Sequence, residues 1–312
     1  MEALAVLLDA PRSLSLRPLA LSEPAETDLV VDVEWSGIST GTERLLWSGR
    51  MPSFPGMGYP LVPGYEAVGR VAAAGARTGG QVGQRVFVPG AHCFGEVRSL
   101  FGASASRLVV PEGRAVPVPE SLGERAVLLA LAATARHALA GGEILPDLIV
   151  GHGVLGRLAA RLVLAAGGPA PTVWETEFVR RDGAEGYAVV DPSQDTRRDY
   201  SCVLDASGDA KLLDGLIARL RPGGEIVLAG FYAAPLTFAF PPAFMREARI
   251  RVAAQWQEAD MAAVSELVAS GTLSLDGLLS HSAPATEATQ AYETAFGDAA
   301  CLKMILDWRG HA

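Results

Sequence analysis

The sequence predicts an α/β fold in two parts, a small β-barrel domain and a doubly wound parallel sheet. Residues 1–120 contain short apolar runs separated by glycine and proline, the pattern of a compact barrel with turns at its corners. In residues 121–256 short apolar runs alternate with stretches of helical periodicity, which is typical of a parallel sheet covered by helices. We expect residues 257–312 to return and complete the first domain.

Composition narrows the classes of partner. The 312 residues are 49% hydrophobic and 20% charged, a globular balance with material for two domains. A net charge of −9 argues against a nucleic-acid partner. Cys93, Cys202 and Cys301 are far apart, so they form no metal pair and suit a reducing compartment. Because we find neither a signal peptide nor a membrane-spanning stretch, we expect a cytoplasmic protein without integral membrane contact.

The first domain is predicted from its strands. Residues 29–35 alternate apolar and polar side chains, and a short helical piece at 44–47 follows a glycine turn. The loop at 49–64 holds four glycines and four prolines, so we expect a shaped loop. Its bulky side chains either pin the loop by packing on one another or form one wall of a large apolar pocket. The predicted strands are 4–8, 29–35, 64–71, 83–88 and 106–110.

The most specific motif lies in the middle of the chain. The apolar run 148–150 is a buried-strand pattern, and GHGVLG (151–156) follows it in the G-x-G-x-x-G spacing. Gly151 permits the tight turn, Gly153 lets a pyrophosphate approach the backbone, and Gly156 lets the next helix lie close to the strand. The helix start offers free N–H groups and a positive dipole to phosphate. The pattern predicts a dinucleotide-binding site.

Glu175 ends the next predicted strand and favours NAD as the cofactor. It lies 24 residues beyond Gly151, near the offset of about 20 residues usual for the acid that binds a ribose diol. A carboxylate accepts hydrogen bonds from the 2′- and 3′-hydroxyls and repels a 2′-phosphate. Arg180 and Arg181 are the counter-argument, since an arginine nearby can hold a 2′-phosphate. The alternative for both is a solvated helix face.

The alternation of strand and helix continues after Glu175. Strands are predicted at 187–190, 202–205, 225–230 and 250–254, and a helix at 211–220. The stretch between Glu175 and Cys202 is too short for two full βα units, so we expect at least one trimmed helix. The cofactor should lie at the carboxyl edge of the sheet. The candidate cofactor-binding residues are Gly151, His152, Gly153, Val154, Leu155, Gly156, Glu175, Ser207, Gly230 and Phe231.

This order of segments resembles the medium-chain dehydrogenase/reductase superfamily, and the resemblance covers essentially the whole chain. Its landmarks are Gly37-Ile38 with Gly41-Thr42-Glu43, Gly64-Tyr65-Glu66, Gly83 with Arg85-Val86, and the GHGVLG turn. The resemblance implies a GroES-like β-barrel domain, an inserted Rossmann domain, a nicotinamide cofactor and a homodimer.

The departures from this superfamily concern zinc. In zinc-dependent members the first landmark carries a cysteine ligand, where this chain has Thr40, or Ser39 if the gap is moved. The histidine of the second landmark is replaced by Tyr65, and the third ligand position, in the connecting helix, is Ala130. The four-cysteine structural lobe is also missing, since only Cys93 lies in that region. Because a catalytic zinc needs three protein ligands, we expect no bound metal.

Three long stretches are similar to the dehydrogenases of bacteriochlorophyll biosynthesis that oxidise a 1-hydroxyethyl group to acetyl. They are SGISTGTERLLWSGRMPSFPGMGYPLVPGYE, VFVPGAHCFGEVRSLFGASASRLVVP and PPAFMREARIRVAAQW. This resemblance implies a chlorin-type tetrapyrrole substrate, a bacteriochlorophyllide, which needs apolar walls and a cation for its carboxylate. The residues that could supply them are Arg44, Trp47, Arg50, Met51, Phe54 and Tyr59.

Tyr65 stands where the superfamily has its histidine and is the leading candidate to move the hydroxyl proton. It could relay the proton with Glu66, Ser39 or Thr40 behind it. An unperturbed tyrosine has a pKa of about 10, which favours a relay over a final base. The alternative is that Tyr65 only fills the space that zinc left. His92 is a second candidate base, against the plainer interpretation of a solvated loop histidine.

Three functions remain open from the sequence. The first is an NAD-dependent secondary-alcohol dehydrogenase that acts on a hydroxyethyl bacteriochlorophyllide without zinc. The second is a zinc-free quinone or enoyl reductase of the same superfamily, a group that usually prefers NADPH. The third is a non-catalytic sensor that kept the dinucleotide site and lost the chemistry.

Overall fold

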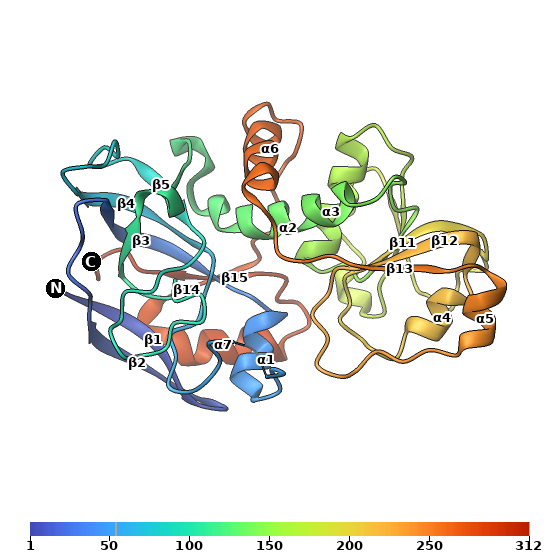
Figure 1. Cartoon of the computed structure of the whole chain (residues 1–312), viewed down its shortest axis with the longest axis horizontal. Coiled ribbons are helices and arrows are strands. Elements are labelled where there is room, and N and C mark those ends of the chain that lie inside the picture. The colour runs from blue at the N-terminus through green and yellow to red at the C-terminus, as the bar shows by residue number, and fades with distance from the viewer. Residues whose placement is uncertain (54, 312) are drawn as a thin grey trace. The chain divides into compact units, whose positions relative to one another are not determined.

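The chain divides into two units with different sheets, seen in a computed structural model that describes residues 1–53 and 55–311 (Figure 1). One unit comprises Met1–Ala130 and Leu278–Ala312, and the other comprises Leu131–Gly277. The predicted boundaries at 120 and 256 therefore move to 130 and 277. Among the described residues no helix is both long and apolar enough to cross a bilayer.

The first unit is built on a mixed sheet and a hairpin. Its strands are β1 (Glu2–Ala10), β2 (Ser13–Ala20), β3 (Asp28–Ile38), β4 (Ala67–Ala74), β5 (Arg85–Val88), β6 (Arg107–Pro111), β7 (Val116–Pro117), β14 (His281–Pro284) and β15 (Met304–Asp307). The sheet order is β14-β15-β3-β4-β5-β7, with β6 also pairing with β3, while β1 and β2 form the hairpin. β15 comes from the C-terminal segment and pairs antiparallel with β3.

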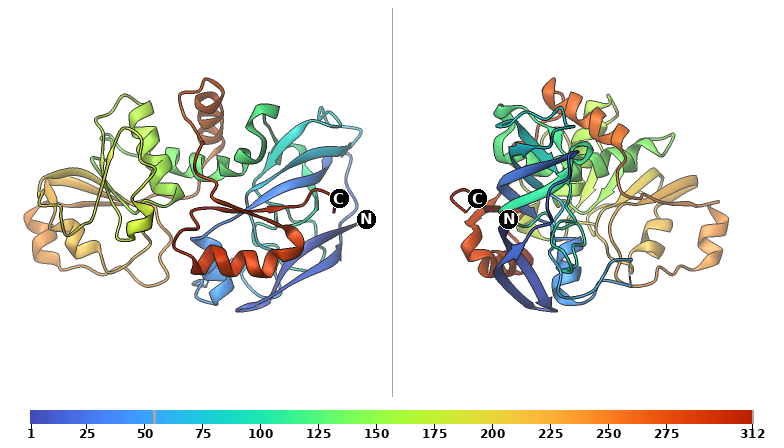
Figure 2. Two further views of the ribbon diagram at one scale, coloured as in Figure 1. Left: turned by 180° about the vertical axis from the view of Figure 1, so that it is seen from behind. Right: turned by 60° about the vertical axis from the view of Figure 1, so that its left-hand side comes forward.

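Short helices close the first unit. They are α1 (Thr42–Ser48), η1 (Glu112–Arg114), η2 (Glu120–Leu128), η4 (Ala285–Glu287) and α7 (Ala288–Gly297). α1 follows β3 and includes the short helical piece predicted at 44–47. It ends at Gly49, whose φ of 70° suits glycine. α7 packs against β2, β14 and β15 (Figure 2). The buried core of this unit thus joins the N-terminal strands to the C-terminal segment.

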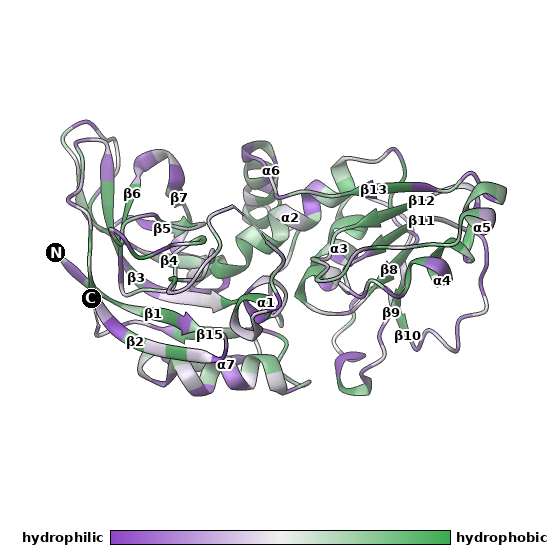
Figure 3. Cartoon of the chain, turned by 60° about the horizontal axis from the view of Figure 1, so that its bottom comes forward, coloured by the Kyte–Doolittle hydropathy of each residue, from purple (hydrophilic) through white to green (hydrophobic). Residues whose placement is uncertain are grey.

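The second unit holds six parallel strands. They are β8 (Leu148–Val150), β9 (Thr172–Trp174), β10 (Ala188–Val190), β11 (Tyr200–Asp205), β12 (Leu220–Leu228) and β13 (Arg249–Val252). Their order is β10-β9-β8-β11-β12-β13, with every pair parallel. The strands β11 and β12 are largely hydrophobic (Figure 3), as expected for a sheet buried on both faces. The order reverses between β8 and β11, which is the switch point where such sheets bind ligands.

The helices of the second unit are unequal in length. They are α2 (Leu129–Ala140), α3 (Val154–Ala165), η3 (Phe178–Arg180), α4 (Leu213–Ile217), α5 (Phe240–Met245) and α6 (Glu258–Ala269). The trimmed connection is confirmed, because only the three-residue η3 lies between β9 and β10. α5 went unpredicted because Pro241-Pro242 suggests a helix breaker, whereas prolines are tolerated in the first turn of a helix.

Two further elements differ from the prediction. The helix expected before the second domain is partly 3₁₀, since η2 precedes α2 and Gly123 within it has a φ of 53°. The sequence predicts a helix at 211–220 and a separate strand at 225–230, but the segment between them, Pro222-Gly223-Gly224, lies within β12. The pairing of β12 with β11 shifts register there, so a single bulged strand spans the predicted gap.

Helix α6 belongs to the second unit, against the predicted boundary. Asp260 caps its first turn by accepting the Gln257 N–H at 2.9 Å. The same carboxylate is bonded to Arg136 at 3.3 Å and to His137 at 2.8 Å, both on α2. Because Asp260 is buried, these contacts fix α6 on α2 within one unit.

Candidate active site

The glycine turn has the shape that the motif predicts. Gly151 adopts a φ of 97°, a conformation that favours glycine. A Cβ on Gly156 would lie 1.9 Å from the Gly151 carbonyl oxygen, so α3 can approach the turn only without a side chain there. A Cβ on Gly153 would meet no described atom within 4 Å, so the turn is open at this position. Gly153 is the N-cap of α3, where the first backbone N–H groups of the helix are free to bind an anion.

The predicted cofactor residues at three strand ends lie close together. Gly151 follows β8, Ser207 follows β11, and Gly230 follows β12. A Cβ on Gly151 would be 3.5 Å from the Ser207 backbone, and one on Gly230 would be 2.7 Å from the Gly208 nitrogen. Phe231 is exposed beside them. A ligand at the carboxyl edge of the sheet would therefore meet mainly backbone atoms.

Glu175 is held beside the glycine turn by backbone donors. Its Oε2 accepts the His152 N–H at 3.0 Å, and its Oε1 accepts the Glu177 N–H at 2.9 Å. Each carboxylate oxygen has a second lone pair, so both can still accept a hydroxyl hydrogen. The predicted ribose acid is thus fixed in orientation and retains capacity for a diol.

The side chain of His152, a candidate cofactor-binding residue, points into the protein and away from the surface of the turn. The ring is buried, its Nδ1 is bonded to the Arg180 carbonyl oxygen at 2.6 Å, and its Nε2 is bonded to the Tyr187 hydroxyl at 2.9 Å. Since a carbonyl only accepts, Nδ1 carries the hydrogen and Nε2 accepts from Tyr187. Burial lowers the pKa of His152 to about 4, so the ring is neutral. Only the backbone of His152 belongs to the turn surface.

Two arginines near Glu175, the predicted ribose-binding acid, donate hydrogen bonds to other groups of the protein. Arg157 is buried and donates to the carbonyls of His152, Arg180 and Asp182 at 2.8–3.0 Å. Arg181 donates to the Glu175 carbonyl oxygen at 2.9 Å and to the Asp191 carboxylate at 2.5 Å. Arg181 therefore does not lie on a solvated helix face, and its Nε and Nη2 already donate to groups of the protein.

In the first unit, Tyr65 and Ser39 form a pair of bonded hydroxyls. The Tyr65 hydroxyl donates to the Ser39 Oγ at 2.5 Å, and the Tyr65 ring stands edge-on to Phe101 at 5.2 Å. Burial, and next the charge of Glu66, raise the pKa of Tyr65 above its ordinary value. The phenol therefore stays protonated at neutral pH, which suits a relay and excludes a phenolate base.

Glu66 lies behind this pair in a buried ion pair with Lys303, as Glu66 Oε2 contacts the Lys303 Nζ. Among the described residues Glu66 Oε1 has no hydrogen-bond partner. A Cβ on Gly37 would lie 2.1 Å from Glu66 Oε2, so glycine is required at that position of β3. Lys303 was missed by the sequence analysis. A lysine inside the apolar run of the last strand is the sign that an acid is buried opposite.

Glu43 was also missed. It is fully buried in α1, accepts the Ser39 N–H at 3.0 Å through Oε1, and accepts the Tyr292 hydroxyl at 2.6 Å through Oε2. Burial raises its pKa to about 7. The residues Ser39, Glu43, Tyr65, Glu66, Tyr292 and Lys303 are called the buried polar cluster below.

The structure does not connect the other two catalytic candidates to this cluster. The Thr40 side chain makes no described hydrogen bond to Tyr65, so Ser39 is the hydroxyl that the structure pairs with it. His92 is exposed, its Nδ1 is bonded to the Ser99 Oγ at 2.9 Å, and it lines a pocket of about 260 Å³ with Asp28 and Arg114. The role of His92 as a base has no support in this geometry.

Most of the side chains predicted to form an apolar wall for the substrate pack together in a small hydrophobic cluster. Met51 is buried and packs in a cluster with Leu46 and Leu61. Trp47 and Tyr59 are half-buried on the same cluster, and the Tyr59 hydroxyl donates to the Leu46 carbonyl. The loop is thus pinned by its own side chains, which is one of the two alternatives left open by its sequence.

The remaining substrate candidates are exposed or not described. Arg44 and Arg50 are exposed, and in the described part of the chain neither forms an ion pair. Phe54 lies outside the described residues. The two arginines remain available for a carboxylate.

The residues at the three positions that bind zinc in other members of the superfamily offer few atoms that could bind that metal. Ser39 and Tyr65 are bonded to each other, and Ala130 has no ligand atom in its side chain. Zinc in proteins takes cysteine, histidine or carboxylate ligands. Over residues 1–53 and 55–311 no three histidine, cysteine or acidic side chains gather in a way that could hold a metal ion.

Comparison with known proteins agrees with both halves of this geometry. Residues 25–120 match the alcohol dehydrogenase GroES-like domain family. The chain is 59% identical, over the full length of both proteins, to the 2-desacetyl-2-hydroxyethyl bacteriochlorophyllide A dehydrogenase of Cereibacter sphaeroides. It is 57% identical, over 99% of each, to the protein of that name from Rhodobacter capsulatus. The chain belongs to the family of these dehydrogenases, within the medium-chain dehydrogenase/reductase superfamily.

Solved structures confirm the fold. The L-idonate 5-dehydrogenase of Escherichia coli superposes with a TM-score of 0.85 at 17% identity, over 98% of each chain. An Escherichia coli alcohol dehydrogenase solved with NADH superposes with a TM-score of 0.83 at 20% identity, over 98% of this chain and 99% of that one. At these identities the likeness concerns the fold alone, a GroES-like domain joined to a Rossmann domain.

Proposed function

We propose that this chain oxidises the 1-hydroxyethyl group of a bacteriochlorophyllide to acetyl, with NAD⁺ as the hydride acceptor and without zinc. The observation that carries the proposal is the full-length identity of 59% to a dehydrogenase named for that substrate. The test is incubation of purified protein with NAD⁺ and the hydroxyethyl pigment. A shift of the pigment's long-wavelength absorption band together with NADH formation is expected. An unchanged band with intact NAD binding would favour a non-catalytic sensor.

In the reaction the carbinol group loses a hydride from its carbon and a proton from its oxygen. The nicotinamide, when bound, supplies the hydride acceptor. Tyr65 relays the proton: its oxygen takes the proton of the substrate O–H, its own proton passes to the Ser39 Oγ, and the Ser39 hydroxyl proton leaves to solvent water as the final acceptor. A carbinol attached to a conjugated macrocycle spreads the developing positive charge over the ring. The substrate therefore needs less electrophilic help than a simple alcohol, which agrees with the absence of zinc ligands.

The absence of a metal requirement has a direct test. We expect full activity after dialysis against a strong zinc chelator, and much less than one zinc per chain by elemental analysis. The reason is that the donor atoms present at the three ligand positions do not suit zinc. A zinc-dependent alcohol dehydrogenase treated in parallel should lose its activity. Tightly held zinc that is needed for turnover would refute the metal-free mechanism.

Glu175 should set the preference for NAD over NADP. In Glu175→Gln one acceptor oxygen is kept but the charge is lost, so we expect affinity for NAD to fall about tenfold, the size of one hydrogen bond to a charged group. We expect discrimination against NADP to shrink as well, since less charge repels the 2′-phosphate. Dissociation constants for both cofactors measure the effect. Glu177→Gln, the same change on an exposed neighbour, is the control and should leave the ratio unchanged.

A strong preference of the unaltered protein for NADPH would instead favour the reductase alternative. The Nε and Nη2 groups of Arg157 and Arg181 donate to carbonyl and carboxylate partners within the protein, which supports NAD because these groups are not directed at a 2′-phosphate. Cys93, Cys202 and Cys301 are buried and form no disulfide, which supports a reducing compartment such as the cytoplasm.

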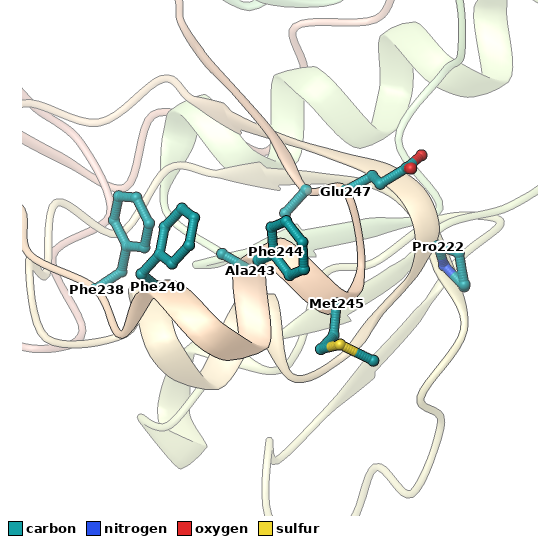
Figure 4. Close-up of a pocket in the computed structure, with 8 residues that line it drawn as sticks. Pro222, Phe238, Phe240, Ala243, Phe244, Met245 and Glu247 are labelled. Atoms are coloured by element: carbon teal, nitrogen blue, oxygen red, sulfur yellow. The ribbon is translucent and has the colours of Figure 1, made fainter.

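We also propose that two copies of the chain form a homodimer. The dimer interface would be an apolar surface on and around α5, called the α5 patch. This patch comprises Phe238, Phe240, Phe244 and Met245, with Met245 74% exposed (Figure 4). β13 lies at the edge of the six-stranded sheet and carries Val252, which is 73% exposed. An apolar patch beside an open strand edge needs a cover. A second copy related by a two-fold axis would pair β13 with its own equivalent and cover both patches.

The dimer prediction is tested by Phe244→Glu. We expect the unaltered protein to sediment as a dimer and the variant as a monomer, because a charge in the centre of an apolar interface would be buried without a partner. Val82→Glu places the same charge on an exposed valine of the other unit and should remain dimeric. A monomeric unaltered protein, or a dimeric Phe244→Glu variant, would refute this surface.

A further inference from the structure

The buried polar cluster contains two acids that differ in their partners. Burial raises the pKa of Glu66, and direct contact with the ammonium of Lys303 opposes that rise. Glu43 receives hydrogen bonds only from neutral donors, the Ser39 N–H and the Tyr292 hydroxyl. Of the two carboxyls, Glu43 is therefore the one without a cation in direct contact, and its backbone contact to Ser39 joins it to the Tyr65–Ser39 pair.

Glu43 reaches the Tyr65–Ser39 pair through the backbone of Ser39. The N–H that it accepts belongs to the residue whose hydroxyl receives the Tyr65 hydrogen bond. Ser39 is buried, so its hydroxyl is oriented by these two contacts within the protein. A change in the charge or position of Glu43 is thus transmitted to the pair by one residue.

We propose that Glu43 is a positioning residue that orients the Tyr65–Ser39 pair and whose ionisation sets the acid side of the pH dependence of alcohol oxidation. The inference rests on the proposed function, because it concerns how the same proton relay is controlled. A negative charge beside the pair stabilises the proton that the substrate gives up, and a neutral carboxyl does not.

The surroundings of Glu43 decide the pH range. Burial raises its pKa to about 7, and the charge of Glu66 raises it further, while the Tyr292 hydroxyl, the Ser39 N–H and the charge of Lys303 lower it. Tyr65 and Tyr292 are the other titratable groups that face it, and burial holds the pKa of each above the ordinary value. Glu43 is therefore ionised above about pH 7, and oxidation should lose rate below it.

The test is the pH dependence of kcat for NAD-dependent oxidation of the hydroxyethyl pigment. In the unaltered protein we expect kcat to fall about fivefold between pH 7 and pH 6 and to approach a tenfold fall per pH unit below pH 6, as for a single ionisation with a pKa of about 7. Glu43→Gln keeps an oxygen for the Ser39 N–H and cannot ionise, so its profile should be flat there and its plateau about tenfold lower. Glu43→Asp should restore the acid limb.

Tyr292→Phe gives a second, independent readout. It removes a donor that stabilises the carboxylate, so the acid limb should move to higher pH. Binding of NAD and the thermal unfolding midpoint of each variant check folding. A Glu43→Gln variant with the acid limb of the unaltered protein, or a Tyr292→Phe limb that stays in place or moves to lower pH, would overturn the inference.

Failure of the inference and failure of the proposed function give different results. If the unaltered protein does not oxidise the pigment at any pH, the proposed function fails. The Glu43 assignment is then read by infrared difference spectroscopy across pH 5–9. A protonated-carboxyl band that titrates near pH 7 and is absent from Glu43→Gln is expected. An identical band in both proteins would overturn the assignment whatever the activity.

Discussion

Replacing Lys303 with methionine is expected to lower the free energy of unfolding by about 3–5 kcal/mol, the cost of breaking a buried ion pair from one side. Lys303 is 1% exposed and Glu66 is fully buried, so water cannot replace the lost ammonium. The orphaned carboxylate must either stay charged without a partner or take up a proton. Each outcome costs folding free energy, and Glu66 Oε1 already has no partner among the described residues.

Urea denaturation at pH 7 measures the effect, and two variants serve as controls. Arg309→Met removes the cation of the exposed Arg309–Asp307 pair and should cost less than about 1 kcal/mol. Adding Glu66→Gln to Lys303→Met removes the orphaned charge and should recover part of the loss. A Lys303→Met variant as stable as Arg309→Met would show that the pair contributes nothing to folding.

The nucleotide region could be predicted from the sequence because its determinants are local. The strand, the glycine turn and the start of α3 are neighbours along the chain, and the strand predicted at 148–150 is β8 with the same bounds. Gly151 and Gly156 are constrained by contacts within a few residues. Such patterns survive in a single sequence, since the turn needs glycine wherever the strand and helix meet.

The buried polar cluster could be predicted only in part, because its contacts join distant segments. Tyr65 was identified from its place in a landmark, but Lys303 and Tyr292 come from the last 21 residues of the chain. The Lys303–Glu66 pair spans 237 positions and the Tyr292–Glu43 bond spans 249. No periodicity or spacing reports a contact over that separation. Only the presence of lysine in an apolar run hinted at a buried partner.

His152 shows a different limit of sequence reasoning. Its place in a glycine turn suggested an exposed side chain, since turn residues are usually solvated. The structure instead buries the ring against the Arg180 carbonyl and the Tyr187 hydroxyl. These partners come from η3 and the residue just before β10, so the trimmed connection was needed to place them. The sequence predicted that a helix was missing but not what took its place.

Replacing Tyr65 with phenylalanine is expected to lower kcat for the hydroxyethyl pigment by about 10³-fold, within the range of general acid–base groups. Phenylalanine keeps the ring and its edge-on contact with Phe101 and removes only the hydroxyl that donates to Ser39. Affinity for NAD should be unchanged, because the residues that would bind it belong to the other unit. The loss should therefore appear in the proton step alone.

Tyr200→Phe is the matched control, since it makes the same chemical change at a buried tyrosine bonded to Asp195 in the second unit. It should leave kcat within about twofold, because surface and structural hydroxyls outside the relay take no part in the reaction. If Tyr65 and Ser39 act as one relay, the double variant Tyr65→Phe with Ser39→Ala should be hardly worse than Tyr65→Phe alone, since residues that act as a unit are not additive. A Tyr65→Phe variant that retains more than a third of kcat would assign the phenol to space-filling and leave the proton to another group.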